Sequence, residues 1–395
     1  MKNNSTISII GGGGRVGLPL GIILASRGHK VIIIETDKSR INQINNREMP
    51  FFEKDAKGIF LKLPISRLFA TEDQSYIEHS EICIVVIGTP VSEDGLPSTN
   101  NLIALTKELV PYLNNVKLLI LRSTVYPGIT NQIKSVLQDS NLNTEISFSP
   151  ERIAEGLAIE ELQSLPQIVG VDSEEAFILA SKLFKSIGID IIRTSIEEAE
   201  LAKLFSNAFR YVNFAIANEF FKICVEKNID WEKVWFASKH NYPRNNHLAY
   251  PGFAAGPCLV KDTKQLNYYT NGKFSLGQES LEINENLPDF IVDLLLTKYD
   301  LSNKTVGILG MTFKGNVDDF RDSLSFRLKK ILEGHAKEVI CSDEILQKPY
   351  FVDFDTVLSK SDIIIIASPH KSYKNLKTNK ILIDIWRISQ SDSII

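Results

Sequence analysis

The sequence predicts an α/β protein with two doubly wound domains joined by a long central helix, and three observations support this fold class. Short apolar, β-branched runs alternate with helical stretches through the first 195 residues, as is typical of a mostly parallel sheet with helices on both faces. Residues 197–228 form one helical run without glycine or proline. A second alternation begins at Lys304. We therefore expect three parts, residues 1–195, 196–300 and 301–395.

The individual elements follow from the apolar periodicity. In the first part we expect a helix at 18–26 and strands at 6–10, 31–34, 82–87, 118–121, 146–148 and 167–171. The long helix carries an apolar face from Leu201 to Ile216, so it should bridge two domains or form a subunit interface. Further on we expect helices at 280–298 and 323–333 and strands at 305–309, 338–341, 362–367 and 381–385.

The composition of this 395-residue chain, 44% hydrophobic and 23% charged, is that of an ordinary soluble globular protein. Its formal net charge of −4 argues against nucleic acid or an anionic membrane as partner. No apolar run is long enough to span a bilayer, and residues 1–6 lack the features of a signal peptide. Four cysteines, at 83, 224, 258 and 341, show no metal-ligand spacing, so we expect a cytoplasmic protein without a bound metal.

A glycine-rich turn, Gly12-Gly13-Gly14-Arg15-Val16-Gly17, follows the first predicted strand. Gly12 permits the tight turn, Gly14 lets the backbone approach a pyrophosphate, and Gly17 allows close packing of helix and strand. The amino-terminal end of the next helix would bind the phosphates. Glu35, at the end of the second strand, would accept hydrogen bonds from ribose hydroxyls and repel a 2′-phosphate. The context predicts Rossmann-like domains, the first of which binds NAD; the alternative is a glycine turn that binds nothing.

One cysteine differs from the other three in its surroundings. Cys258 follows Gly256 and Pro257, which suit a fixed loop without regular structure, whereas the others lie in apolar strands or on the long helix. Lys261 would favour the reactive thiolate, and Asp262 would accept a proton or position water. A single loop cysteine is more often structural than catalytic. In a dehydrogenase, however, a thiol nucleophile indicates oxidation of an alcohol through an aldehyde and a thioester to an acid.

Polar residues on the long helix and at the strand ends add to this chemistry. Lys203, Asn207 and Arg210 are spaced i, i+4, i+7 and share one helix face. A lysine and an asparagine one turn apart can stabilise an oxyanion, although a solvated polar face is the simpler interpretation. Ends of parallel strands in one sheet meet at one edge, where the predicted polar segments are Gly88-Thr89-Pro90, Arg122-Ser123-Thr124 and residues 149–156.

Taken together, these segments resemble the UDP-glucose/GDP-mannose dehydrogenase family of NAD-dependent nucleotide-sugar 6-dehydrogenases. The resemblance runs from Ser8 to about Arg387 and includes GGGRVGLPL, IGTP, RSTVYPG, SPERIAEG, AELAKLFSNAFR, GPCLVKDTKQL and GMTFKGNVDDFRDS, in that order. It implies an NAD domain, a central helical dimerisation segment and a C-terminal domain for the nucleotide of the sugar. It also implies a homodimer that uses two NAD for each UDP-sugar.

The resemblance also implies roles for individual residues. Cys258 matches the nucleophile, Lys203 and Asn207 the oxyanion-stabilising pair, and Asp262 the acid that handles water. Thr124 and Glu151 match positions that hold water and assist proton transfer. The implied cofactor-binding residues are Gly12, Gly14, Arg15, Val16, Gly17, Glu35, Thr89, Thr124, Glu155 and Arg321. The implied substrate-binding residues are Glu151, Arg152, Lys203, Asn207, Arg210, Arg244, Tyr250, Phe253, Gly256 and Lys314, with Arg244 contributed across the dimer.

The identity of the sugar follows less directly. Ser149–Arg152, Phe209–Asn213 and Ser368–His370 look like the branch that oxidises UDP-N-acetylhexosamines, which favours UDP-N-acetyl-D-mannosamine. Residues 258–266 look instead like bacterial UDP-glucose dehydrogenases, which makes UDP-glucose the alternative. Pro257 departs from the residue types usual before the family cysteine, and it removes a backbone N–H there. Two other classes stay open, a two-electron β-hydroxyacid-type dehydrogenase and a nucleotide-sugar binder without activity.

Overall fold

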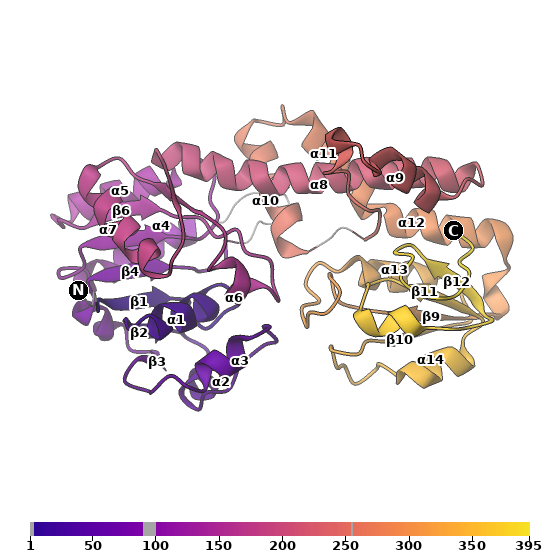
Figure 1. Ribbon diagram of the computed structural model, residues 1–395, viewed down its shortest axis with the longest axis horizontal. Helices are drawn as coiled ribbons and strands as arrows, with labels where there is room; N and C mark the ends of the chain where they lie inside the picture. Colours follow the sequence, from indigo (N-terminus) through magenta and orange to yellow (C-terminus); the bar gives the residue numbers. More distant parts are fainter. Residues whose placement is uncertain (1–3, 90–99, 254–255) are drawn as a thin grey trace. The chain divides into compact units, whose positions relative to one another are not determined.

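The computed structural model describes residues 4–89, 100–253 and 256–395. The chain divides into two compact units, an N-terminal unit up to Ser206 and a C-terminal unit from Asn207 (Figure 1). Each unit contains one β-sheet, and a long helix, α8 (Ile196–Glu226), begins in the first unit and ends in the second. The predicted α/β fold is confirmed. No helix in the described ranges combines the length and the apolarity that crossing a bilayer requires.

An eight-stranded sheet forms the centre of the N-terminal unit, in the order β3-β2-β1-β4-β5-β6-β7-β8. Its strands are β1 (Thr6–Ile10), β2 (Lys30–Ile34), β3 (Leu68–Thr71), β4 (Ile82–Val85), β5 (Leu118–Leu121), β6 (Glu145–Phe148), β7 (Gln167–Gly170) and β8 (Ile191–Thr194). All neighbouring strands are parallel except β6 and β7, which are antiparallel. The sheet is therefore mostly parallel, as predicted.

Helices cover both faces of this sheet. Alternate strand residues accordingly pack in two separate hydrophobic clusters, one on each face. Ile7 and Ile9 of β1 pack in the cluster that includes α1 and α7, and Ile10 packs in the one that includes α4 and α5. The helices are α1 (Gly17–Ser26), α2 (Lys38–Asn45), α3 (Ala56–Phe60), α4 (Asn100–Leu109), α5 (Ile129–Asp139), α6 (Ala158–Glu161) and α7 (Glu174–Ser186). Two short 3₁₀ helices are η1 (Gln74–His79) and η2 (Val110–Tyr112).

After α8 the C-terminal unit contains α9 (Trp231–Lys239), η3 (Pro243–Asn245), α10 (Pro257–Tyr269), α11 (Ser275–Glu285) and α12 (Leu287–Lys298). The single helix predicted at 280–298 is wrong, since the structure has two helices there. Pro288, the second residue of α12, has no N–H to donate, and its ring would clash with the carbonyl four residues earlier in a continuous helix. The chain therefore ends one helix at Glu285 and begins the next at Leu287.

A four-stranded parallel sheet, in the order β10-β9-β11-β12, completes the C-terminal unit. Its strands are β9 (Thr305–Leu309), β10 (Glu338–Ser342), β11 (Ile363–Ile366) and β12 (Ile381–Asp384). The accompanying helices are η4 (Leu301–Asn303), α13 (Leu324–Leu332), α14 (Phe354–Lys360) and η5 (Lys371–Asn375). Clusters on both faces bury alternate residues of β11, which confirms the second doubly wound sheet.

Candidate active site

The glycine turn joins β1 to α1, as predicted, and its three key glycines differ in what surrounds them. A Cβ on Gly12 would lie 2.8 Å from Ile9 O, and one on Gly17 would lie 2.5 Å from Gly12 Cα. A Cβ on Gly14 would meet nothing closer than Gly11 O, at 3.9 Å. Gly12 and Gly17 are thus required by the fold itself. The bare backbone at Gly14 instead borders open space, which fits the close approach of a dinucleotide pyrophosphate.

Glu35 ties the end of β2 to this turn. Its carboxylate is nearly buried and accepts hydrogen bonds from the N–H groups of Gly13 (3.0 Å), Thr36 (2.8 Å) and Asp37 (3.2 Å). A carboxylate offers about four acceptor positions, so one remains on Oε2 for a ribose hydroxyl. The glycine turn and Glu35 together fit the adenosine half of NAD.

Two other predicted cofactor residues lie together in the N-terminal unit. Arg15 Nε is 3.8 Å from Glu155 Oε2, and the Arg15 guanidinium lies over the Phe51 ring at 5.0 Å. Both side chains of the ion pair are mostly buried, about 20% exposed. This contact links the glycine turn to the segment after β6, so the residues predicted from two distant motifs are neighbours.

The loops after β4 and β5 are also tied together. Thr89 Oγ1 donates to Thr124 O at 2.6 Å, and Ser123 Oγ donates to Ile87 O at 2.7 Å. Thr89 and Thr124 are thus neighbours at the carboxyl edge of the sheet. Pro90, the next residue of the predicted motif, lies outside the described residues.

Glu151 is held by Arg122, a residue that we expected at this edge of the sheet but to which we assigned no role. Arg122, whose side chain is fully buried, forms an ion pair with Glu151 Oε2 and donates to Gln167 Oε1 at 3.0 Å. Glu151 Oε1 accepts from the N–H groups of Arg152 (2.8 Å) and Ile153 (3.1 Å). The Arg152 guanidinium donates to Pro166 O. An arginine directly after an apolar strand is the sequence signal that could have indicated this partner.

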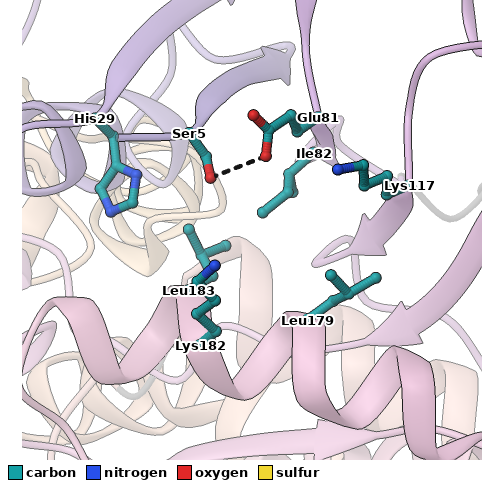
Figure 2. Close-up of a pocket in the computed structure, with 8 residues that line it drawn as sticks. All are labelled: Ser5, His29, Glu81, Ile82, Lys117, Leu179, Lys182 and Leu183. Carbon is teal, nitrogen blue, oxygen red and sulfur yellow. Dashed lines mark hydrogen bonds between the residues drawn. The ribbon is translucent and has the colours of Figure 1, made fainter. Parts of the chain in front are cut away.

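A cavity of about 80 Å³ in the N-terminal unit lies away from these residues. Ser5, Glu81 and Lys117, which help to line it, directly precede β1, β4 and β5 (Figure 2). It is therefore at the amino-terminal edge of the sheet, whereas the glycine turn and the threonine loops follow the strand ends. The cavity is separate from the candidate cofactor site.

On α8, Lys203 and Asn207 are buried, 8% and 6% exposed, whereas Arg210 is exposed. Asn207 Nδ2 donates to Asp262 Oδ2 at 2.5 Å. Asp262 is fully buried, and its other oxygen lies 3.5 Å from Lys261 Nζ. The structure thus brings together Asn207 and Asp262, two residues predicted from motifs 55 positions apart.

The predicted irregular loop around Cys258 is wrong, because α10 begins at Pro257 and places Cys258 in its first turn. Proline suits the first helical position, where no N–H partner is needed. Gly256, just before it, has φ of +106°, which a side chain rarely allows. The amino-terminal end of a helix stabilises negative charge, so this position suits a thiolate better than the predicted loop.

Cys258 is the exposed cysteine of the four. Burial raises the pKa of the Cys83 and Cys341 thiols to about 12 and also raises the pKa of Cys224. These three thiols therefore stay protonated and unreactive near neutral pH. Among the cysteines, only the environment of Cys258 suits a nucleophile.

The loop between β9 and α13 lies next to the start of α10. A Cβ on Gly256 would be 2.6 Å from the Phe313 ring. Gly256, two residues before Cys258, therefore lies against Phe313, which directly precedes Lys314. Further along, the Arg321 guanidinium is bound to Asp319, with Nε 3.0 Å from each carboxylate oxygen. Cys258 and Lys314 thus belong to two segments in contact within one unit.

The remaining predicted substrate residues occupy different surroundings. Arg244 Nη1 donates to Tyr242 Oη at 3.3 Å, and its guanidinium lies over that ring, with no described contact to another predicted residue. Tyr250 packs edge-on against Trp235, and Phe253 is a core residue, 3% exposed.

Sequence reasoning missed Asn218, a buried residue of α8. Its Nδ2 donates to Gly252 O at 3.2 Å and its Oδ1 accepts from Gly252 N–H at 2.9 Å. This pair of bonds fixes Gly252, six residues before Cys258. An asparagine among the apolar positions of the helix was the available signal.

Comparison with known proteins places the chain in a family. The NAD binding, central and UDP binding domains of the UDP-glucose/GDP-mannose dehydrogenase family match residues 5–188, 197–286 and 307–391. The chain belongs to this family. It is accordingly an NAD-dependent nucleotide-sugar dehydrogenase that acts on a UDP-sugar.

Relatives within the family carry names for different sugars. The UDP-N-acetyl-D-mannosamine dehydrogenase of Methanocaldococcus jannaschii is 30% identical over 372 residues, 92% of this chain and 85% of that protein. The UDP-glucose 6-dehydrogenase of Bacillus subtilis is 27% identical, over 95% of this chain and 86% of that protein.

Solved structures agree in fold. That of the UDP-D-ManNAc dehydrogenase from Pyrococcus horikoshii has a TM-score of 0.89 and 26% identity, and it covers 98% of this chain and 99% of that chain. A UDP-glucose dehydrogenase from Pyrobaculum islandicum has a TM-score of 0.90 at 21% identity, covering 100% and 98%. At that identity the second comparison speaks for the fold alone.

Proposed function

We propose that this enzyme oxidises the C6 hydroxyl of a UDP-sugar to a carboxylate in two steps, through a covalent bond to Cys258. The observation that carries the proposal is the position of Cys258, exposed in the first turn of α10 and four residues before Asp262, which is buried and bonded to Asn207. A two-electron dehydrogenase would need no such thiol. The family membership restricts the reaction to the nucleotide-sugar class.

In the proposed reaction, two molecules of NAD, bound one after the other, would supply the hydride acceptors for the two oxidations. Removal of a hydride and a proton from C6 gives an aldehyde, and the Cys258 thiolate adds to it, forming a C–S bond. Loss of a second hydride converts this thiohemiacetal to a thioester. Water then breaks the C–S bond and releases the carboxylate and the thiol. One alcohol and one water thus yield one carboxylate, two reduced cofactors and three protons.

The side chains around the reacting carbon have separate proposed roles. Lys203 and Asn207 would stabilise the oxyanion of the thiohemiacetal, and Asp262 would position the water that cleaves the thioester. Thr124 and Glu151 would hold water and assist proton transfer. The backbone and arginine contacts of Glu151 keep its carboxylate fixed for that task.

The remaining assignments extend the same proposal. The glycine turn, Glu35, Thr89, Glu155 and Arg321 would bind NAD. The proposed substrate contacts are Arg152, Arg210, Arg244, Tyr250, Phe253, Gly256 and Lys314. We further propose three domains, with the boundaries 1–195, 196–300 and 301–395. We also propose that the enzyme is a homodimer and is located in the cytoplasm.

For the sugar we propose UDP-N-acetyl-D-mannosamine, since six of the similar curated proteins carry that name. The segment Ser149–Arg152 resembles the same branch. UDP-glucose is the second candidate, favoured by the sequence of residues 258–266 and by the similarity to the Bacillus subtilis enzyme.

A panel of UDP-sugars, with NADH absorbance as readout, tests the proposal. We expect two NADH for each molecule of the preferred sugar, with UDP-N-acetyl-D-mannosamine the fastest. Cys258→Ser should abolish acid formation while NAD binding persists. Cys224→Ala is the matched control, because it removes a protonated, buried thiol from the same unit. One NADH per sugar, or full acid formation by the Cys258→Ser variant, would refute the covalent mechanism.

A further inference from the structure

The loop that carries Lys314, residues 310–316, is fixed at both ends by polar side chains from elsewhere in the C-terminal unit. At its start, Met311 N–H donates to Asp343 Oδ2 at 2.6 Å. At its end, Asn316 N–H donates to His370 Nδ1 at 3.0 Å, and Asn316 Oδ1 accepts from Lys371 N–H at 2.9 Å. These bonds come from the loops after β10 and β11, so three strand ends are tied together at one edge of the small sheet.

His370 joins the two ends of this loop. Its Nε2 is 3.0 Å from Asp343 Oδ2, the same oxygen that binds Met311, and both side chains are fully buried. Because Asn316 N–H donates to Nδ1, that nitrogen carries no proton, and the ring proton must lie on Nε2, directed at Asp343. The 3.5 Å approach of Nδ1 to Glu344 Oε1 is therefore not a hydrogen bond.

Inside the loop, Thr312 extends the same network. Its hydroxyl donates to Lys314 O at 2.9 Å, and its oxygen lies 3.2 Å from His370 Nε2, whose proton is directed at Asp343. The Thr312 side chain thus binds the backbone of Lys314 while it packs against His370. A buried network with every member satisfied selects a single arrangement of the backbone that it holds.

The fit of the loop is also steric. A side chain on Gly315 would overlap Pro369 O, and a Cβ on Gly310 would lie 2.7 Å from Ser368 Cβ. Asn316 has φ of +61°, the left-handed conformation that asparagine tolerates. The loop thus lies directly on residues 368–370, and its Phe313 ring lies against Gly256.

We propose that His370 is a positioning residue for the nucleotide-sugar: it holds the 310–316 loop in the conformation that presents Lys314 to the substrate. The role of Lys314 rests on the proposed function, whereas the role of His370 in holding the loop does not. Replacement of His370 removes the acceptor for Asn316 N–H and one of the donors to Asp343, which leaves the partly buried Asn316 N–H without its partner.

The test compares His370→Ala with two variants that each keep one polar group of the histidine. His370→Asn keeps only an acceptor near the Nδ1 position, and His370→Gln keeps only a donor near the Nε2 position. For His370→Ala we expect hydrogen exchange at the Met311 and Asn316 amides to accelerate by about tenfold or more, with strand β9 unaffected. The KM for the UDP-sugar should rise by roughly tenfold while kcat changes by less than about threefold. His370→Asn and His370→Gln should each recover part of the loss. His335→Ala, at an exposed histidine of the same unit, should match the native protein.

Unchanged exchange at Met311 and Asn316, or a fall in kcat with KM unchanged, would overturn the proposal. Should His370→Ala not fold, the His370→Asn and His370→Gln variants give the same two measurements. If the native protein oxidises no UDP-sugar, the proposed function fails, but hydrogen exchange still decides whether His370 holds the loop.

Discussion

At the scale of single residues, buried carboxylates in this enzyme mostly fix loops through backbone N–H groups. Glu53 accepts from Gly156 and Ala158, and Glu200 accepts from Gly128 and Thr130. Asp262 differs, because in the described part of the chain its carboxylate contacts side chains alone, those of Asn207 and Lys261. Its second oxygen is buried without a hydrogen-bond partner there. A buried carboxylate with spare acceptor capacity, four residues after the proposed nucleophile, is suited to hold a water molecule.

Replacing Asp262 with asparagine should therefore slow thioester hydrolysis more than oxidation. We expect kcat to fall by about 10²-fold or more, because general-base assistance is lost. A covalent acyl group should accumulate on Cys258, detectable by mass spectrometry of the intact protein after mixing with UDP-sugar and NAD. Asp293→Asn, at an exposed position of α12, is the control and should keep native turnover. Turnover near the native rate in Asp262→Asn, without an adduct, would remove Asp262 from the mechanism.

Whether the sequence indicates that two residues act together depends on how far apart they lie along the chain. Cys258, Lys261 and Asp262 stand within five residues of one another, so their combination is visible in one segment. The bond from Asn316 to His370 joins residues 54 positions apart, and the ion pair of Arg122 and Glu151 spans 29. No periodicity specifies such pairs, because they depend on which strand ends become neighbours in the sheet.

At the scale of elements, the inner strands of both sheets were predictable, as were the edge strands of the smaller sheet, whereas the two edge strands of the larger sheet were not. Thr6–Ile10 and Leu118–Leu121 are apolar throughout and match the predicted bounds. The edge strands β3 and β8 were missed, since their sequences are not continuously apolar: β3 alternates buried and half-buried residues, and no residue of β8 is fully buried. The start of α10 was missed for a different reason, because proline and glycine indicate a loop and a helix amino terminus equally well.

The strand–turn–helix element at the cofactor site allows a paired prediction. Gly17→Ala should lower the free energy of unfolding by about 1–3 kcal/mol, because its Cβ would overlap Gly12. Gly14→Ala should leave stability nearly unchanged, because that Cβ has room, yet weaken NAD binding by about tenfold or more. Urea denaturation and NAD titration by calorimetry give the two quantities. Equal NAD affinity in Gly14→Ala and the native protein would show that the cofactor does not approach that backbone.

At the scale of the whole molecule, the chain combines an NAD binding domain and a UDP binding domain. Its longest described helix, α8, exposes several apolar side chains to solvent. On α8, within the C-terminal unit, Phe209, Ile216, Phe220 and Ile223 are 60%, 43%, 47% and 55% exposed. Their spacing of 7, 4 and 3 residues puts them on one helix face. Isolated exposed apolar residues are ordinary, but a continuous stripe of this kind is typical of a protein interface.

If this stripe is the homodimer contact, a charge placed in it should separate the subunits. We expect the native protein to elute with the mass of a dimer in size-exclusion chromatography with light scattering. Phe220→Asp should raise the dimer dissociation constant by about 100-fold or more, since an unpaired carboxylate would be buried against apolar side chains. Lys227→Glu, just beyond the carboxyl end of α8 and exposed, is the matched control and should stay dimeric. A monomeric native protein, or a Phe220→Asp variant as dimeric as the control, would require a different interface.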